Sequence, residues 1–236
     1  MLKLTLLTLS SVAALVFGDV LKVSAAVLNS SFESGNFQSW STAGQVTVED
    51  ANFGVTPQDG TYQAVLETLQ DTTEVGGSDL ENFLGLTVGS LTDLGVTEGS
   101  AIKQTVTLKA GDIISFSWNF LTDQDPSENN YNDLGFFVLN GFTLLADTTE
   151  VTNLSLFTRL SRETGYKTAS ITVQAAGIYL LGFGVVDVDK TDSGDTAVNS
   201  ALLIDNISVT SVPEPLTLLG VATAALLGTV FKRNLS

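Results

Sequence analysis

The chain has 236 residues and a formal charge of −16, and it contains no cysteine and no histidine. The lack of cysteine excludes disulfides, thiolate metal sites and cysteine nucleophiles, and the lack of histidine excludes the usual general base and any Ser-His-Asp triad. A surface this acidic repels phosphate backbones, so nucleic acid is not an expected partner, whereas cations and neutral glycans are compatible with it. The length suits one domain between two processing segments.

Residues 1–26 have the pattern of a secretory signal peptide. Lys3 supplies a short positive region, residues 4–17 are mostly apolar, and residues 23–26 read Val-Ser-Ala-Ala, which offers small side chains for cleavage. The alternative is a buried N-terminal helix. We expect signal peptidase to remove this segment and the mature chain to begin at Ala26 or Val27.

Residues 27–211 are predicted to form one all-β domain. Ile114, Phe116, Trp118 and Phe120 alternate with polar residues, which is the period of two of a half-buried strand. A hairpin is expected over residues 101–120. A second is expected over residues 134–145, with its turn at Asn140-Gly141. Further strands are predicted over 169–173, 178–186 and 201–209, and the glycines at 182 and 184 predict a bulge or close packing.

These strands predict an antiparallel two-sheet β-sandwich with jelly-roll or Greek-key topology. The domain is expected to be flanked by an N-terminal signal helix and a C-terminal transmembrane-like helix. No helical period is apparent between the two termini. Residues 71–100, rich in Thr, Gly, Ser and Asp, are predicted to be the most loop-like part of the domain.

Residues 212–236 form a segment of a different kind. Pro213, Glu214 and Pro215 precede an apolar run over residues 216–231, and Lys232 and Arg233 follow it. At a rise of about 1.5 Å per residue the run covers about 24 Å as a helix, slightly short of a hydrocarbon core of about 30 Å. Taken alone, this segment is a marginal tail anchor with its basic pair on the cytoplasmic side.

This ending resembles the PEP-CTERM sorting signal in all three parts: the Pro-Glu-Pro motif, the short apolar helix and the basic end. The resemblance implies recognition by an exosortase and processing near the motif. It also implies an intermediate anchored in the inner membrane, followed by delivery to the cell surface or the extracellular matrix. It carries no information about the central domain.

A second resemblance concerns the edges of that domain. The start at Asn29, Phe32 and Glu33, with Trp40 following, and the closing strand around Asp205 resemble the first and last strands of jelly-roll carbohydrate-binding modules. In that family a structural calcium is often held at the positions of Glu33 and Asp205, and carboxylates are the hard oxygen ligands that calcium prefers. The alternative is that both side chains cap strand ends or accept backbone hydrogen bonds.

Two acidic loops are weaker candidates for an ion. Neither needs a metal, since solvated loops are often acidic, and the second does not have the spacing of an EF-hand. Their members are Asp123, Asp125, Glu128 and Asp133 in the first loop, and Asp187, Asp189, Asp192 and Asp195 in the second.

Trp40, Tyr62 and Tyr131 are the aromatic residues proposed to stack on sugar rings, although Trp40 could instead pack in the core. The sequence therefore favours a non-enzymatic surface or matrix protein whose β-sandwich is adhesive or contacts extracellular polysaccharide. One alternative is a carbohydrate-binding module with a defined sugar site. Another is a glycoside hydrolase with paired carboxylates, a chemistry that needs no histidine.

Overall fold

The computed structural model describes residues 26–68, 75–124, 132–155, 158–188 and 199–211. Residues 1–25 of the predicted signal peptide, the Pro-Glu-Pro motif and the apolar run that follows it lie outside these residues. Within the described ranges, no helix has the length and apolar character needed to cross a membrane.

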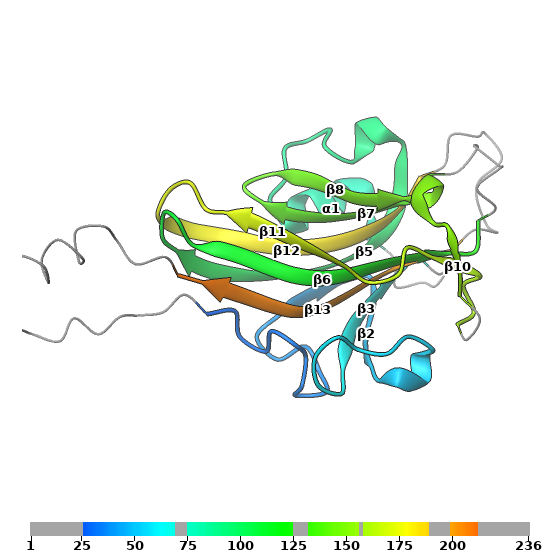
Figure 1. The fold of residues 1–236 in the computed structure, drawn as a ribbon. Coiled ribbons are helices and arrows are strands. Elements are labelled where there is room, and N and C mark those ends of the chain that lie inside the picture. Colours follow the sequence, from blue (N-terminus) through cyan, green and yellow to red (C-terminus); the bar gives the residue numbers. More distant parts are fainter. Residues whose placement is uncertain (1–25, 69–74, 125–131, 156–157, 189–198, 212–236) are drawn as a thin grey trace, which may run out of the picture.

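The predicted sandwich of two antiparallel sheets is confirmed (Figure 1). Sheet A has the order β1-β5-β12-β7-β8, with β4 paired to β5. Its strands are β1 (Ser41–Ala43), β4 (Val75–Gly76), β5 (Val96–Leu108), β7 (Leu134–Leu139), β8 (Phe142–Asp147) and β12 (Gly177–Val188).

Sheet B has the order β2-β3-β13-β6-β10-β9, with β11 paired to β6. Its strands are β2 (Gln45–Glu49), β3 (Gln63–Glu67), β6 (Ile113–Thr122), β9 (Asn153–Leu154), β10 (Arg162–Glu163), β11 (Lys167–Thr172) and β13 (Ser200–Thr210). Three short 3-10 helices lie in the described connections: η1 (Ala51–Phe53), η2 (Thr92–Leu94) and η3 (Thr148–Glu150).

The core lies between the two sheets and is rich in aromatic rings. Phe116 of sheet B packs edge-on against Phe183 and Phe137 of sheet A, with ring centroids 4.9 and 5.3 Å apart. Phe116 and Phe183 are fully buried. The alternation predicted for β6 therefore places its aromatic face against the opposite sheet.

The hairpin predicted over residues 101–120 is wrong. β5 belongs to sheet A and β6 to sheet B, so the chain passes from one sheet to the other between them instead of forming a hairpin. At the crossing, the Gly111 amide donates to the Val173 carbonyl at 2.8 Å. The inward faces of both strands are apolar, and alternation alone does not distinguish neighbours within a sheet from strands that face each other across a core.

The second predicted hairpin is confirmed. β7 and β8 pair directly, and Asn140 and Gly141 have positive φ values of 61° and 147°. An Asn-Gly pair tolerates this backbone better than other residues do, so the turn follows from local sequence.

The expectation of no helix between the two termini is also wrong. α1 (Gly77–Leu84) lies in the segment predicted to be loop-like and ends at Gly85, which has a φ of 64°. Leu80 and Leu84, four residues apart, are buried against the outer face of sheet A. Eight residues surrounded by Gly, Ser and Thr are too few to give a clear helical period.

Both ends of the domain emerge at the same end of the sandwich (Figure 1). The Ile207 amide of β13 donates to the Ser30 carbonyl at 3.0 Å, which joins the last strand to the first turn of the domain. The Leu28 amide donates to Gln104 Oε1 at 2.8 Å. The segments predicted to be processed are therefore attached at one end of the domain.

Candidate ligand-binding groove and acidic sites

A groove of about 320 Å³ lies on the outer face of sheet A, beside the end of α1. Val138 of β7 and Leu180 of β12 come from the sheet, Leu84 and Leu86 come from the helix and its end, and Phe142 comes from β8. The remaining lining residues are Gly85, Thr87, Ser90, Asn140 and Gly141.

The groove exists because α1 covers only part of the sheet. The helix lies close because β12 presents Gly182 beneath it, where a Cβ atom would be 2.8 Å from Leu84 Cδ2. Lys103 of β5 donates to the Phe83 carbonyl, and its Nζ lies 4.1 Å from the centroid of the Phe83 ring. Beyond the helix the outer face stays open, and Ile178 of β12 is 77% exposed.

The segment after α1 is held by a buried carboxylate. Glu81 Oε1 accepts hydrogen bonds from the backbone amides of Gly89, Leu91 and Thr92, at 3.1, 2.8 and 2.9 Å. The bonds from the Thr92 and Leu91 amides lower the pKa of Glu81, so this carboxylate stays ionised while it orders the loop. That loop carries Ser90 and Thr87, two of the polar groups at the groove.

The groove is suited to binding and not to proton transfer. None of its lining residues is titratable, whereas Thr87, Ser90 and Asn140 offer hydroxyl and amide groups. The Phe142 ring packs against Phe136, with centroids 4.9 Å apart, and stays half-buried. An aromatic face beside apolar walls and a few neutral polar groups is the lining expected for an uncharged ligand.

Trp40 and Tyr62, two of the three aromatic candidates from the sequence, do not line the groove. Trp40 is 7% exposed, packs on Phe32 and Phe183, and donates from Nε1 to the Asn29 carbonyl at 3.2 Å. It therefore lies in the core, which is the alternative that the sequence left open. Tyr62 is half-buried against the same core. Tyr131 lies outside the described residues.

Glu33 and Asp205 both hold the loop over residues 57–62. Asp205 Oδ2 accepts from the amides of Gln58 and Asp59 at 2.6 and 2.8 Å, and Oδ1 accepts from the Asn206 amide at 2.6 Å. Glu33 Oε1 accepts from the Thr61 and Tyr62 amides at 2.9 and 2.8 Å. Burial raises the pKa of Asp205 to about 6, although the hydrogen bonds from the Asp59, Asn206 and Gln58 amides lower it.

These hydrogen bonds are the alternative to calcium that the sequence left open, and they account for the burial of Asp205 without an ion. Among the described residues, no three or more acidic side chains form a group that could hold a metal ion. Calcium at Glu33 and Asp205 stays a prediction.

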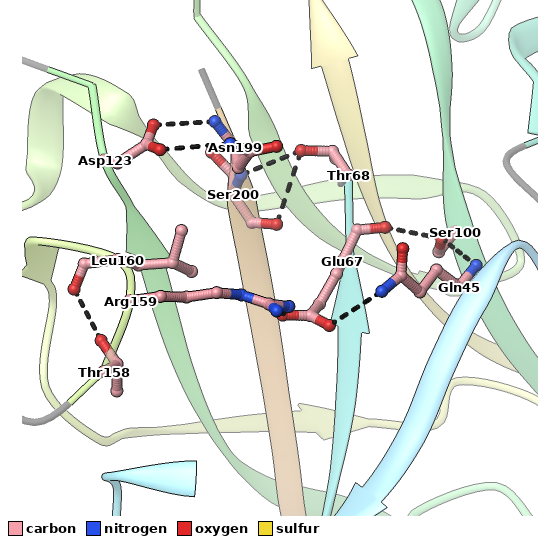
Figure 2. A network of polar contacts seen from close by, with 10 residues as sticks. All are labelled: Gln45, Glu67, Thr68, Ser100, Asp123, Thr158, Arg159, Leu160, Asn199 and Ser200. Atoms are coloured by element: carbon pink, nitrogen blue, oxygen red, sulfur yellow. Dashed lines mark hydrogen bonds and ion pairs between the residues drawn. The ribbon is translucent and has the colours of Figure 1, made fainter. Parts of the chain in front are cut away.

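The structure brings together one member of each predicted acidic loop. Asp133 precedes β7 and Asp187 lies in β12, and both are buried. Asp123 lies nearby in the sequence but has a structural role: its Oδ1 accepts from the Asn199 amide at 2.8 Å (Figure 2). Asp125, Glu128, Asp189, Asp192 and Asp195 lie outside the described residues.

An ion pair with a buried carboxylate lies on the outer face of sheet B. Arg159 donates to Glu67 Oε1, and Gln45 Nε2 lies 3.4 Å from Glu67 Oε2 (Figure 2). Burial raises the pKa of Glu67, although the hydrogen bond and the charge of Arg159 lower it. Neither partner lines the groove, so the pair has no direct part in a ligand site there.

No protein-family model matches the sequence, and no curated protein matches it. Similar solved structures include TmCBM61 in complex with beta-1,4-galactotriose (16% identity, TM-score 0.42, 80% of this chain and 99% of that chain). A second is a structure of carbohydrate-binding modules of the β-sandwich superfamily (11% identity, TM-score 0.38, 77% of this chain and 61% of that chain). A third is the N-terminal cellulose-binding domain of β-1,4-glucanase C from Cellulomonas fimi (11% identity, TM-score 0.32, 76% of this chain and 92% of that chain). At this degree of similarity, the ligands of those proteins do not identify the ligand of this chain.

The sequence did not reveal the groove. Phe142 was predicted only as a strand residue, and Leu84 and Leu86 lie in the segment predicted to be loop-like. The spacing of Leu80 and Leu84, with Gly85 directly after them, is the one local signal of a short helix that ends at a glycine.

Proposed function

We propose that this protein is an exported, non-catalytic β-sandwich that binds a neutral glycan in the groove between α1 and β8. The observation that carries the proposal is an uncharged groove with an aromatic wall on a domain of strongly acidic composition. A sugar ring has apolar faces for Phe142 and hydroxyl groups for Asn140, Ser90 and Thr87. A neutral ligand also avoids the repulsion that an anionic polymer would meet.

The terminal segments support export to the cell surface or extracellular matrix. The signal-like residues 1–26 and the Pro-Glu-Pro segment suit cleavage by signal peptidase and sorting by an exosortase. Since both attach at one end of the domain, the opposite end of the sandwich would point away from the membrane before processing (Figure 1). Detection of the chain on intact cells, lost when Pro213, Glu214 and Pro215 are replaced by alanine, would support this route.

Glycan binding is tested with the full chain in mild detergent on an array of neutral and acidic polysaccharides. We expect binding to a neutral glycan that is about tenfold weaker after Phe142→Ala, since aromatic contacts dominate such sites. The matched control is Leu154→Ala, which removes a 66% exposed side chain on sheet B. Equal loss in both variants, or no neutral glycan bound at all, would contradict the proposal.

The hydrolase alternative receives less support from the described residues. Glycoside hydrolysis needs two carboxyl groups beside the bound sugar, and no carboxylate lines the groove. Release of reducing sugar from the glycan that the protein binds, abolished by replacing a single carboxylate, would favour catalysis over binding.

A further inference from the structure

Two carboxylates face each other between the ends of the sheets, independently of the groove. In the antiparallel pairing of β12 with β7, Val186 lies opposite Leu134. One residue after Val186 and one residue before Leu134, the same antiparallel register places Asp187 opposite Asp133. Residues opposite each other in an antiparallel pair point to the same face, with Cβ atoms about 4.5–5.5 Å apart.

Both side chains point into the sandwich and are removed from water. Leu134 and Val186 pack on the outer face of sheet A, so their neighbours Asp133 and Asp187 point inward. Asp133 is 0% exposed and Asp187 is 4% exposed. The interior is therefore polar at this end, whereas it is aromatic in the middle.

The oxygen atoms around the pair come from both sheets. Thr97 Oγ1 of β5 lies 3.3 Å from Asp187 Oδ2. The side chain of Ser200 on β13 contacts Asp133 and also donates to Thr122 Oγ1 at 2.9 Å. The Ser200 amide donates to Thr68 Oγ1 at 2.9 Å (Figure 2). The Ser200 hydroxyl thus lies beside Asp133 and the hydroxyl of Thr97, an exposed residue of β5, lies beside Asp187.

The two carboxyl groups lie where water screens a charge poorly, since Asp133 and Asp187 are both buried. Asp133 Oδ1 accepts from the Val188 amide at 3.2 Å, but Oδ2 of the same side chain is buried without a hydrogen-bond partner. Burial and the neighbouring Asp187 raise the pKa of Asp133 well above its usual value. Like charges opposite each other destabilise a sheet, so an ionised pair needs either a shared proton or a cation beside it.

We propose that Asp133 and Asp187 bind a divalent cation, with calcium the ion that their hard oxygen ligands favour. Two carboxylates balance its charge, and the Ser200 and Thr97 hydroxyls supply further oxygen atoms of the kind that calcium accepts. The site differs from the one predicted at Glu33 and Asp205, where both oxygens of each carboxylate accept hydrogen bonds from backbone amides. A proton shared between the two carboxyl groups would balance the charge in another way, and the experiment separates the two.

The test uses the full chain in mild detergent, stripped with EDTA and returned to chelator-free buffer. We expect calcium to bind with a stoichiometry of one by isothermal titration calorimetry and to raise the melting temperature, as any ligand specific for the native state must. Asp133→Asn and Asp187→Asn keep the side-chain shape, and each should weaken binding by about tenfold or more. Circular dichroism establishes that the variants are folded.

Asp205→Asn serves as the matched control, since it alters the other predicted calcium position. Calcium binding that survives in Asp205→Asn but fails in Asp133→Asn supports the proposal, and the reverse pattern overturns it. If the wild-type chain shows no binding and no shift in melting temperature at millimolar calcium, the pair shares a proton and the proposal is wrong. Should the Asp133 and Asp187 variants not fold, a wild-type chain that binds no calcium would still overturn it.

Discussion

Leu84 of α1 lies directly on the backbone of Gly182 in β12. A Cβ atom on Gly182 would come within 2.8 Å of Leu84 Cδ2 and 3.4 Å of the Ile102 carbonyl oxygen. The missing side chain therefore sets how closely the helix approaches the sheet. Since α1 forms one wall of the groove, the shape of the groove depends on this contact as well as on the residues that line it.

Gly182→Ala is expected to destabilise the fold by about 1–3 kcal/mol, since the methyl group would overpack a closed contact. It should also weaken glycan binding by displacing the helix. Chemical denaturation measures the loss of stability, and the polysaccharide array measures the loss of glycan binding. Thr105→Ala, at an exposed position of the neighbouring strand β5, should change stability by less than about 0.5 kcal/mol. Equal stability of Gly182→Ala and Thr105→Ala would show that Leu84 does not pack tightly on Gly182.

Trp40→Ala is expected to destabilise the domain by about 3–5 kcal/mol, because it removes a large buried ring from between Phe32 and Phe183. The fraction that remains folded should bind glycan as the wild type does. Urea unfolding, monitored by fluorescence, measures the loss of stability. A variant that keeps its stability but loses glycan binding would instead place Trp40 at the ligand.

Asp205→Ala is expected to cost about 2–4 kcal/mol, since three backbone amides lose a charged acceptor in a buried place. Glu33→Gln should cost less, about 1 kcal/mol, because Glu33 is exposed and an amide oxygen can still accept from Thr61 and Tyr62. Urea unfolding of both variants measures the difference. A larger loss in Glu33→Gln than in Asp205→Ala would contradict these assignments.

The buried Glu67 makes stability depend on pH. Because burial raises its pKa above the ordinary 4.5, the folded chain binds this proton more tightly than the unfolded chain does. This contribution to stability is complete below pH 4.5 and is lost as pH rises through the folded-state pKa. Relative to wild type, Glu67→Gln should therefore gain in melting temperature as pH rises from 4.5 towards neutral.

Arg159→Ala is the matched control for this effect, since Arg159 lowers the pKa of Glu67 (Figure 2). Its removal should make the loss of stability with rising pH steeper, whereas Glu67→Gln makes it shallower. A difference between Glu67→Gln and wild type that does not change with pH would show that Glu67 does not titrate in this range.

Local sequence determined those features that depend on neighbouring residues alone. The alternation in β6 predicted its strand, and Asn140-Gly141 predicted the turn between β7 and β8, because side-chain period and tolerance of positive φ are local properties. The lack of histidine and cysteine likewise excluded whole classes of chemistry, because no fold can supply a side chain that the chain does not contain.

Tertiary structure decided which strands pair and which polar residues meet. The crossing from β5 to β6, the packing of α1 on Gly182 and the position of Trp40 in the core depend on contacts between distant segments. Asp133 and Asp187 are more than fifty residues apart and were assigned to separate acidic loops, yet the β7–β12 register places them opposite each other. Composition and period describe one strand at a time, whereas a binding site is formed by several.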